Sequence, residues 1–393
     1  MRSLILFLFI TFFIFNANCQ VKRVSGCVVN LNKEPIPYCN VYIKGTHIGT
    51  ATNENGKYRL LYPTGSLTSG DSIVFSCIGY EMMKVPANSN FDTVLNVKLK
   101  SCSILLDEIY VSPKNIKEIL RNSLKEIKAG YPTKPSLLTG VYQQILFQDD
   151  SIARIVEAAI DILIPSYIKD KGNQVRLLNV RSTIDSTKFV SSYPDKLNKV
   201  VRLMCLNNTI IPLVEHFDDY EFSYSGELPF QDSKLYLIEF KSKHADKINK
   251  SITGSMYIDV SNNAIVSLRI RAEKEINAQS NIILNNNPTK INLEFLAGEV
   301  RLDYKSYNGK YVISFFHGKD AFNLSIEGDT KKYHMQYIND FFVNKVDIDK
   351  TKKFKQEELI NPNVDLSKQV GITDKSIWEN FNRLIPVQLM PEP

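Results

Sequence analysis

The chain has 393 residues, of which 44% are hydrophobic and 23% charged, with only 17 glycines and 16 prolines. This composition excludes a disordered, collagen-like or low-complexity chain, and the length allows two or three domains of about 150 residues each. The net charge of +6 is spread along the chain instead of forming the basic stripe of a nucleic-acid surface, so we expect no nucleic-acid partner.

Residues 1–20 have the pattern of an export signal. Arg2 is followed by an apolar run over residues 4–15, which is shorter than the about 20 residues that a helix needs to cross a bilayer core. No later stretch reaches that length without a charge. We therefore predict an exported protein with no transmembrane helix in the mature chain.

Cleavage is predicted after Cys19, which makes residues 1–19 the signal peptide and leaves Gln20 first. The rival interpretation is a lipoprotein signal, in which Cys19 itself becomes the acylated first residue. Asn16 and Asn18 stand where such a signal has a leucine-like and a small residue. We therefore favour plain cleavage over lipid attachment.

Five further cysteines are scattered along the chain at Cys27, Cys39, Cys77, Cys102 and Cys205. An odd number over this length does not predict a disulfide framework, although one pair among the first three could oxidise in an exported protein. Cys77 shares its expected strand face with Ile73 and Phe75, which favours buried thiols instead.

Residues 20–112 contain seven short alternating runs separated by turn residues, including a tight turn over residues 53–56. Short strands with regularly spaced turns are typical of an all-β sandwich. The sequence therefore predicts a seven-stranded β-sandwich as the first domain.

The same stretch resembles the carboxypeptidase regulatory-like domain, a transthyretin-like sandwich. The resemblance is carried by residues 24–28, 34–37, 40–46, 49–58, 76–80 and 106–111. Two turns depart from the family pattern, because Tyr38 replaces the usual glycine and Asn53 the usual aspartate. The resemblance implies a Gram-negative envelope protein in which the sandwich is a non-catalytic accessory module.

The family's zinc peptidases need a histidine followed three residues later by glutamate, and no histidine of this chain has that spacing. Other relatives are outer-membrane receptors driven by TonB, which continue into a barrel of 22 strands. The remaining chain is too short to build one. We therefore expect neither a peptidase nor such a receptor.

Residues 113–130 are predicted to form one amphipathic linking helix. Pro113 suits the first helical position after Ser112, and one stripe carries Ile116, Ile119, Leu120, Leu124 and Ile127. A membrane-surface helix is the alternative, but Glu118 and Glu126 dilute the basic charge. We favour packing along a sheet.

Residues 136–350 are predicted to form a large curled antiparallel sheet of about ten strands, open or closed to a half-barrel. Two hairpins are clear, residues 255–260 with 264–270 and residues 299–307 with 310–316. Further strands are expected at residues 139–147, 174–181, 220–224, 235–241 and 333–346. Residues 151–164 fit the periodicity of a strand or of a helix, and we favour a strand. Residues 196–217 are predicted to form a short helical stretch.

This second domain resembles the lipoprotein-carrier fold, in which a curled sheet shelters an apolar cleft, on the basis of residues 254–259 and 264–266 and the strand order. Residues 351–393 are predicted to be a C-terminal tail with a basic surface stretch. The sequence thus predicts a mainly β protein, in which an N-terminal seven-stranded sandwich is joined by one linking helix to a large curled sheet with a C-terminal tail.

The densest polar cluster contains Glu215, His216, Asp218 and Asp219, which could hold a metal or work as acid and base. No second cluster completes a ligand set, so we favour a solvated acidic loop. His317 and His334 are expected to be polar residues at strand ends. We therefore predict no catalytic, metal or cofactor-binding residue and no cofactor.

The leading functional hypothesis is a non-enzymatic binding or docking module in the periplasm or on the outer-membrane surface, with another envelope protein, a lipid or a glycan as partner. One alternative is a periplasmic carrier that holds a lipid or another apolar ligand in the curled sheet. Another is a hydrolase of unrecognised geometry, which would need two or more of the residues Glu215, His216, Asp218 and Asp219 to converge in a cleft.

Overall fold

The computed structural model describes residues 21–46, 48–63, 70–86, 93–102, 113–168, 172–188, 197–231, 233–243, 250–274, 279–282, 291–326, 328, 330–350, 352–373, 375–379 and 381–382. The predicted signal peptide, with the choice between cleavage and lipidation at Cys19, lies outside these residues. Ser112, the expected cap of the linking helix, does so too.

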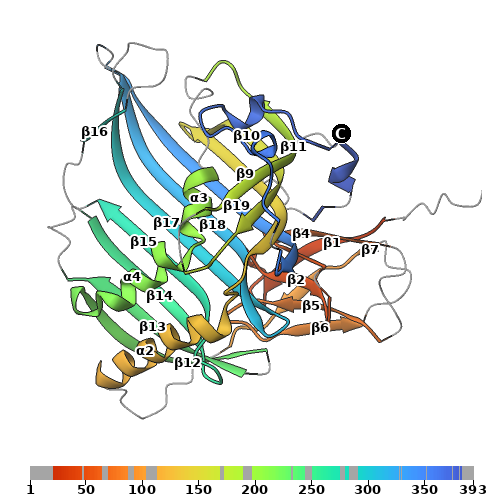
Figure 1. Cartoon of the computed structure of the whole chain (residues 1–393), viewed down its shortest axis with the longest axis vertical. Coiled ribbons are helices and arrows are strands. Elements are labelled where there is room, and N and C mark those ends of the chain that lie inside the picture. The colour runs from red at the N-terminus through yellow and green to blue at the C-terminus, as the bar shows by residue number, and fades with distance from the viewer. Residues whose placement is uncertain are drawn as a thin grey trace, which may run out of the picture.

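The first part of the chain is a β-sandwich of two sheets (Figure 1). One sheet contains β1 (Val21–Asn30), β4 (Lys57–Pro63), β7 (Thr93–Val94) and β8 (Val97–Leu99); the other contains β2 (Asn40–Ile43), β3 (Gly49–Ala51), β5 (Ser72–Ser76) and β6 (Met83–Pro86). Alternate residues such as Val24, Val41 and Phe75 are fully buried between the sheets.

The predicted sandwich is confirmed, but its seventh run is divided into β7 and β8. Between them, the Leu95 amide donates to the Ser25 carbonyl, and the Asn96 side chain accepts from the Cys27 amide at 2.9 Å. These bonds keep both short strands parallel to β1, although the regular strand pairing is interrupted between them at Leu95 and Asn96.

Helix α2 (Pro113–Gly130) confirms the predicted linking helix. Ile116, Leu120 and Ile127 are buried in the core of the second part of the chain, while Glu118 is exposed. The apolar stripe therefore packs against protein, as the favoured interpretation required.

The second part of the chain is one open, curled antiparallel sheet of eleven strands, which confirms the predicted architecture (Figure 1). Ten strands follow the order β11-β10-β9-β19-β18-β17-β15-β14-β13-β12, and β16 pairs with β17. Their bounds are β9 (Ser136–Gln148), β10 (Ser151–Ile164), β11 (Gln174–Ile184), β12 (Tyr220–Phe230), β13 (Ser233–Ser242), β14 (Lys250–Asp259), β15 (Ile265–Lys274), β16 (Gln279–Ile282), β17 (Ile291–Tyr307), β18 (Lys310–Ile326) and β19 (Lys332–Ile348).

Both predicted hairpins exist, and β17 and β18 are much longer than expected, at 17 residues each. Asn308 and Gly309 join them with φ angles of 49° and 75°, as a tight hairpin turn requires. The ambiguous residues 151–164 form strand β10, which is buried on both faces and therefore lacks simple alternation.

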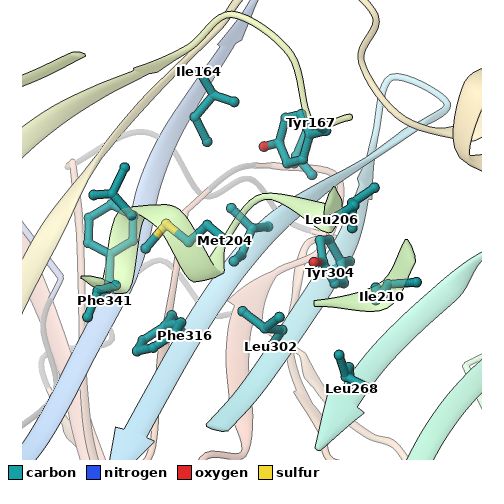
Figure 2. Packing of buried hydrophobic residues seen from close by; sticks show 14 of the residues in the cluster. Ile164, Tyr167, Met204, Leu206, Ile210, Leu268, Leu302, Tyr304, Phe316 and Phe341 are labelled. Atoms are coloured by element: carbon teal, nitrogen blue, oxygen red, sulfur yellow. The ribbon is translucent and has the colours of Figure 1, made fainter. Parts of the chain in front are cut away.

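The inner face of the sheet is covered by α2 and by the helical segment that was predicted within residues 196–217. This segment contains α3 (Leu197–Leu203), α4 (Ile210–Glu215) and 3₁₀ turns. Figure 2 shows Met204, Leu206 and Ile210 from this segment among the sheet residues Leu302 and Phe316. The inner face is therefore packed with side chains along these elements.

The C-terminal segment, residues 352–382, follows the edge strand β11. The amides of Ile360, Ile372 and Thr373 donate to carbonyls of that strand. Trp378 then packs over Arg181 on the opposite, outer face of the sheet, with 4.6 Å between the guanidinium carbon and the ring centroid. The segment predicted as a tail thus caps one edge of the sheet. The domain boundaries given above remain predictions.

Candidate ligand-binding cleft between the sandwich and the sheet

The sandwich rests on the outer face of the sheet, and Tyr38 is its main contact. The pairs Phe316–Phe341 and Phe315–Phe342 are successive across β18 and β19, so they lie on opposite faces. The first pair belongs to the inner core, whereas the second packs with Tyr38 and Ala51 of the sandwich.

A polar row crosses the outer face at the level of this contact. Each of the ten strands contributes one member, and the members are register partners: Ser223, Glu239, Ser255, Arg269, Arg301, His317, Asp340, Gln143, Glu157 and Arg181. Five of these residues, Arg301, His317, Asp340, Gln143 and Glu157, are buried, and the first two contact Tyr38 of the sandwich.

The buried members of the row are paired. His317 Nδ1 lies 2.7 Å from Asp340 Oδ1, and Arg301 Nη2 lies 2.7 Å from Asp303 Oδ2. Burial opposes the charge of Arg301, but the carboxylate of Asp303 outweighs it and raises the pKa of the guanidinium above its usual range. Ser267 donates to the other oxygen of Asp303 at 2.7 Å, so this polar patch is satisfied internally.

Beside this contact the two parts of the chain enclose a cleft with a cavity volume of about 430 Å³. The sandwich contributes Asn40, Tyr42, Gly49, Thr50 and Ser76, and the sheet contributes among others Phe230, Val266, Lys305, Ser306, Tyr311, Phe342 and Lys345. Small-molecule sites in proteins have volumes of about 300–1,000 Å³ and combine apolar walls with a few polar groups. The cleft has both properties.

Lys305 is the most unusual group in this cleft. Its Nζ lies 4.2 Å from the centroid of the Tyr42 ring, and burial lowers the pKa of its ammonium group. Within the part of the chain that the structure describes, we find no carboxylate paired with it. A cation held against an aromatic ring without a counter-charge is electrostatically unbalanced.

Two further polar residues of the cleft are Thr50 and Asp259. The Thr50 side chain is 1% exposed, and its hydroxyl has no hydrogen-bond partner among the described residues. Asp259 Oδ1 accepts from Ser233 and from the amide and hydroxyl of Ser261 at 2.7–2.9 Å, and its Oδ2 accepts from the Tyr311 hydroxyl at 3.4 Å. The cleft therefore offers an unpaired cation and an unpaired hydroxyl.

The acidic cluster singled out from the sequence lies elsewhere, at the C-terminal end of α4 and in the turn that follows it. Glu215, His216, Asp218 and Asp219 are all exposed. His216 Nδ1 is 3.8 Å from Asp219 Oδ2, and Asp218 pairs with Lys117 of α2 at 3.3 Å. These residues do not line the cleft, and no cluster of metal-ligating residues is found in the described ranges.

The prediction for His317 was wrong in position. The residue lies in the middle of β18, not at its end, because that strand continues for nine residues past it, to Ile326. Its imidazole is buried and bonded to Asp340. His334 is exposed in β19, near the start of that strand, with its amide bonded to Asp149.

All five cysteines after Cys19 are free thiols. Cys39, Cys77 and Cys205 are buried, whereas Cys27 and Cys102 are half-buried. The favoured interpretation of buried thiols therefore holds for three of them, and burial raises the pKa of both Cys39 and Cys77.

The comparisons with known proteins identify the first part of the chain. Residues 24–111 match the family model of the CarboxypepD_reg-like domain, so the sandwich is a carboxypeptidase regulatory-like domain, as its sequence implied. This family accounts for the sandwich alone.

Two curated relatives share this region. The chain is 36% identical over 108 residues to a TonB-dependent receptor of Formosa agariphila, across 28% of the chain and 10% of the receptor. It is 36% identical over 96 residues to the TonB-dependent receptor SusC of Bacteroides thetaiotaomicron, across 24% and 9%. The chain spans about a tenth of the length of these relatives.

Solved structures give distant likenesses only. A putative outer membrane lipoprotein-sorting protein domain from Vibrio parahaemolyticus aligns over 60% of this chain and 93% of its own, with 10% identity and a TM-score of 0.26. A LolA superfamily protein from Nitrosomonas europaea aligns over 63% and 98%, with 9% identity and a TM-score of 0.23. Scores of this size do not establish a shared function. Within the described ranges, no helix combines the length and hydropathy needed to cross a membrane.

Proposed function

We propose that the protein is a non-enzymatic binding protein of the Gram-negative cell envelope, and that the cleft between the sandwich and the sheet is its ligand site. The observation that carries this proposal is the cleft itself, whose walls come from both parts of the chain. A site built this way explains why an accessory sandwich is packed against a large sheet. The export-signal pattern and the sandwich shared with TonB-dependent receptors support the envelope location.

The packing favours the cleft over the inner face of the sheet. A carrier that used the inner face would need space where Met204, Leu206 and Ile210 now pack against the strands (Figure 2). Displacing buried side chains of this size would cost several kcal/mol. An apolar ligand is therefore better accommodated in the cleft.

The test is binding of a neutral apolar fluorophore, N-phenyl-1-naphthylamine, to the purified protein. Ser306 is exposed and lines the cleft, so Ser306→Trp fills the cleft without replacing a buried residue. We expect the fluorescence increase to be lost in this variant. Ser223→Trp places the same side chain at an exposed position of β12, away from the cleft, and should leave binding unchanged. Equal binding by all three proteins would refute the proposal.

A further inference from the structure

The charge balance of the cleft indicates what kind of ligand it takes. Lys305 and Lys345 are its two basic residues, and Asp259 is the one carboxylate among its lining residues in the part of the chain that the structure describes. Asp259 accepts from the turn after β14 and from Ser233, and among the described residues neither lysine forms an ion pair with it.

Lys305 is the more informative of the two lysines. Lys345 is exposed, so its charge is hydrated by water and screened by salt. Lys305 is half-buried against the Tyr42 ring. A half-buried ammonium group loses hydration, and a ring face replaces only a small part of it. An anionic oxygen entering the cleft would replace the hydration that the Lys305 ammonium group has lost. The free-energy cost of keeping this group charged would then fall.

Thr50 supplies a second, independent indication. A buried hydroxyl without a partner costs about 1–3 kcal/mol, and it is rare in native structures. A hydroxyl can donate to an anionic oxygen, as the ammonium group does. Thr50 belongs to the sandwich and Lys305 to the sheet, so a ligand that contacted both would bridge the two parts.

The larger part of the cleft wall is apolar, although Asn40, Ser76 and Asn344 also line it. Phe230, Val266 and Phe342 line it together with the rings of Tyr42 and Tyr311. Such walls favour a hydrocarbon or aromatic body over a sugar or a free inorganic ion, because burial of apolar area then contributes to binding.

We propose that the cleft binds an anionic amphipath, a molecule with an apolar body and one carboxylate or phosphate group, and that the anionic group pairs with Lys305. This inference rests on the proposed function, since it assigns a ligand class to the same cleft. The anionic group could belong to a free carboxylic acid or to a phosphate ester, which share the chemistry that Lys305 recognises.

The experiment measures the affinities of decanoate, decyl phosphate and 1-decanol for the full chain by isothermal titration calorimetry. We expect both anions to bind at least about tenfold more tightly than decanol, which corresponds to one charge-assisted hydrogen bond. The anion that binds more tightly identifies the source, either a carboxylic acid or a phosphate ester.

Three variants locate the effect. Lys305→Met should remove the preference for the anions while leaving the affinity for decanol unchanged, and Lys305→Arg should retain most of the preference. Lys241→Gln is the matched control, since it removes an exposed lysine of β13 that does not line the cleft. Lys305→Met should also leave the melting temperature unchanged or higher, because it removes an unpaired half-buried charge. This last result separates a binding role from a structural one.

The outcomes distinguish the two proposals. Equal affinity for decanol and the anions, lost in Ser306→Trp, would overturn the ligand class and keep the cleft as a site. Binding of anions that is unaffected by Lys305→Met would also overturn it. Failure of every probe to bind would remove both proposals.

Discussion

The ring of Tyr38 lies 4.6 Å from the imidazole of His317, tilted by 40°. Tyr38 also contacts Phe315 at 5.4 Å between ring centroids. Its φ angle is 56°, in the left-handed region that favours glycine, and glycine is what the sandwich family usually has here. The residue that departs from the family pattern is thus one of those that pack the sandwich against the sheet.

Replacing Tyr38 should separate backbone strain from packing. Tyr38→Ala keeps the strained φ and loses the ring contacts, so we expect the free energy of unfolding to fall by about 2 kcal/mol. Tyr38→Gly loses the same contacts but relaxes the backbone, and it should recover about 1 kcal/mol of that loss. Urea unfolding measures both values.

Lys33 provides the control for this comparison. Its φ is also positive, at 66°, but its side chain is exposed. Lys33→Gly should change stability by less than about 1 kcal/mol. A Tyr38→Ala protein as stable as the wild type would show that the ring contacts do not stabilise the interface.

Asp365 is predicted to make the stability of the fold depend on acid pH. Its Oδ2 accepts from Arg154 Nη1 at 2.5 Å, and Arg154 is 1% exposed. Burial raises the pKa of Asp365, but Ser367 and Arg154 together outweigh it, and the net pKa is lowered. A carboxyl group with a lowered pKa in the folded state stabilises the protein above its unfolded pKa, and this contribution is lost as the pH falls.

Asp365→Asn should therefore cost about 3 kcal/mol at pH 7, because it removes the carboxylate that lies 2.5 Å from the buried Arg154 guanidinium. The difference from the wild type should shrink as the pH falls below about 4. Denaturant unfolding at several pH values measures it. Asp150→Asn, at an exposed turn, should have little effect at any pH. A constant difference between pH 7 and pH 3 would contradict the assigned ion pair.

The thiols should differ in reactivity. Cys39 is fully buried and burial raises its pKa, so both access and thiolate population are low. Cys27 is half-buried. N-ethylmaleimide labelling followed by peptide mapping should modify Cys27 at least about tenfold faster than Cys39 in the native protein. In denaturing urea the two rates should converge, and equally fast labelling of the native protein would disprove the burial of Cys39.

Replacement of two glycines by alanine should change the stability of the protein in opposite directions. A Cβ at Gly140 would lie 2.3 Å from the Phe342 carbonyl oxygen and 2.9 Å from the Phe341 ring, so Gly140→Ala should cost about 3 kcal/mol. A Cβ at Gly130, the last residue of α2, has no atom within 4 Å. Gly130→Ala should therefore stabilise the protein by up to about 1 kcal/mol. Thermal unfolding of both variants checks the close strand approach at Gly140.

Local sequence patterns predicted most of the elements because their physical causes are local. Asn308 and Gly309 adopt positive φ angles, which asparagine tolerates and which glycine adopts freely because it has no Cβ, and Pro113 begins the linking helix. The length of β18 was underestimated because His317 and Asp320 interrupt the apolar run. Those polar residues find partners in Asp340 of β19 and Lys199 of α3, which no local pattern contains.

The cleft could not be found in the same way. Thr50 and Lys305 are far apart in the sequence, and Lys305 is one of 48 basic residues. One signal was present, since Arg301, Asp303 and Lys305 occupy alternate positions of a predicted strand and must share a face. Three charged residues on one face of a long strand indicate a polar interface, but only the fold shows what lies opposite.

Asn382 connects the last described residues to both halves of the molecule. Its side chain accepts from the Leu61 amide at 2.6 Å and donates to the Leu61 carbonyl at 3.0 Å, at the free edge of β4. Its backbone exchanges two hydrogen bonds with the Asn344 side chain of β19, at 2.7 and 2.8 Å. Synthesis delivers Asn382 321 residues after Leu61. The backbone groups of Leu61 therefore gain these two hydrogen bonds only after the sheet strands have been made, and a chain halted before Asn382 would leave this part of the β4 edge for another polar partner.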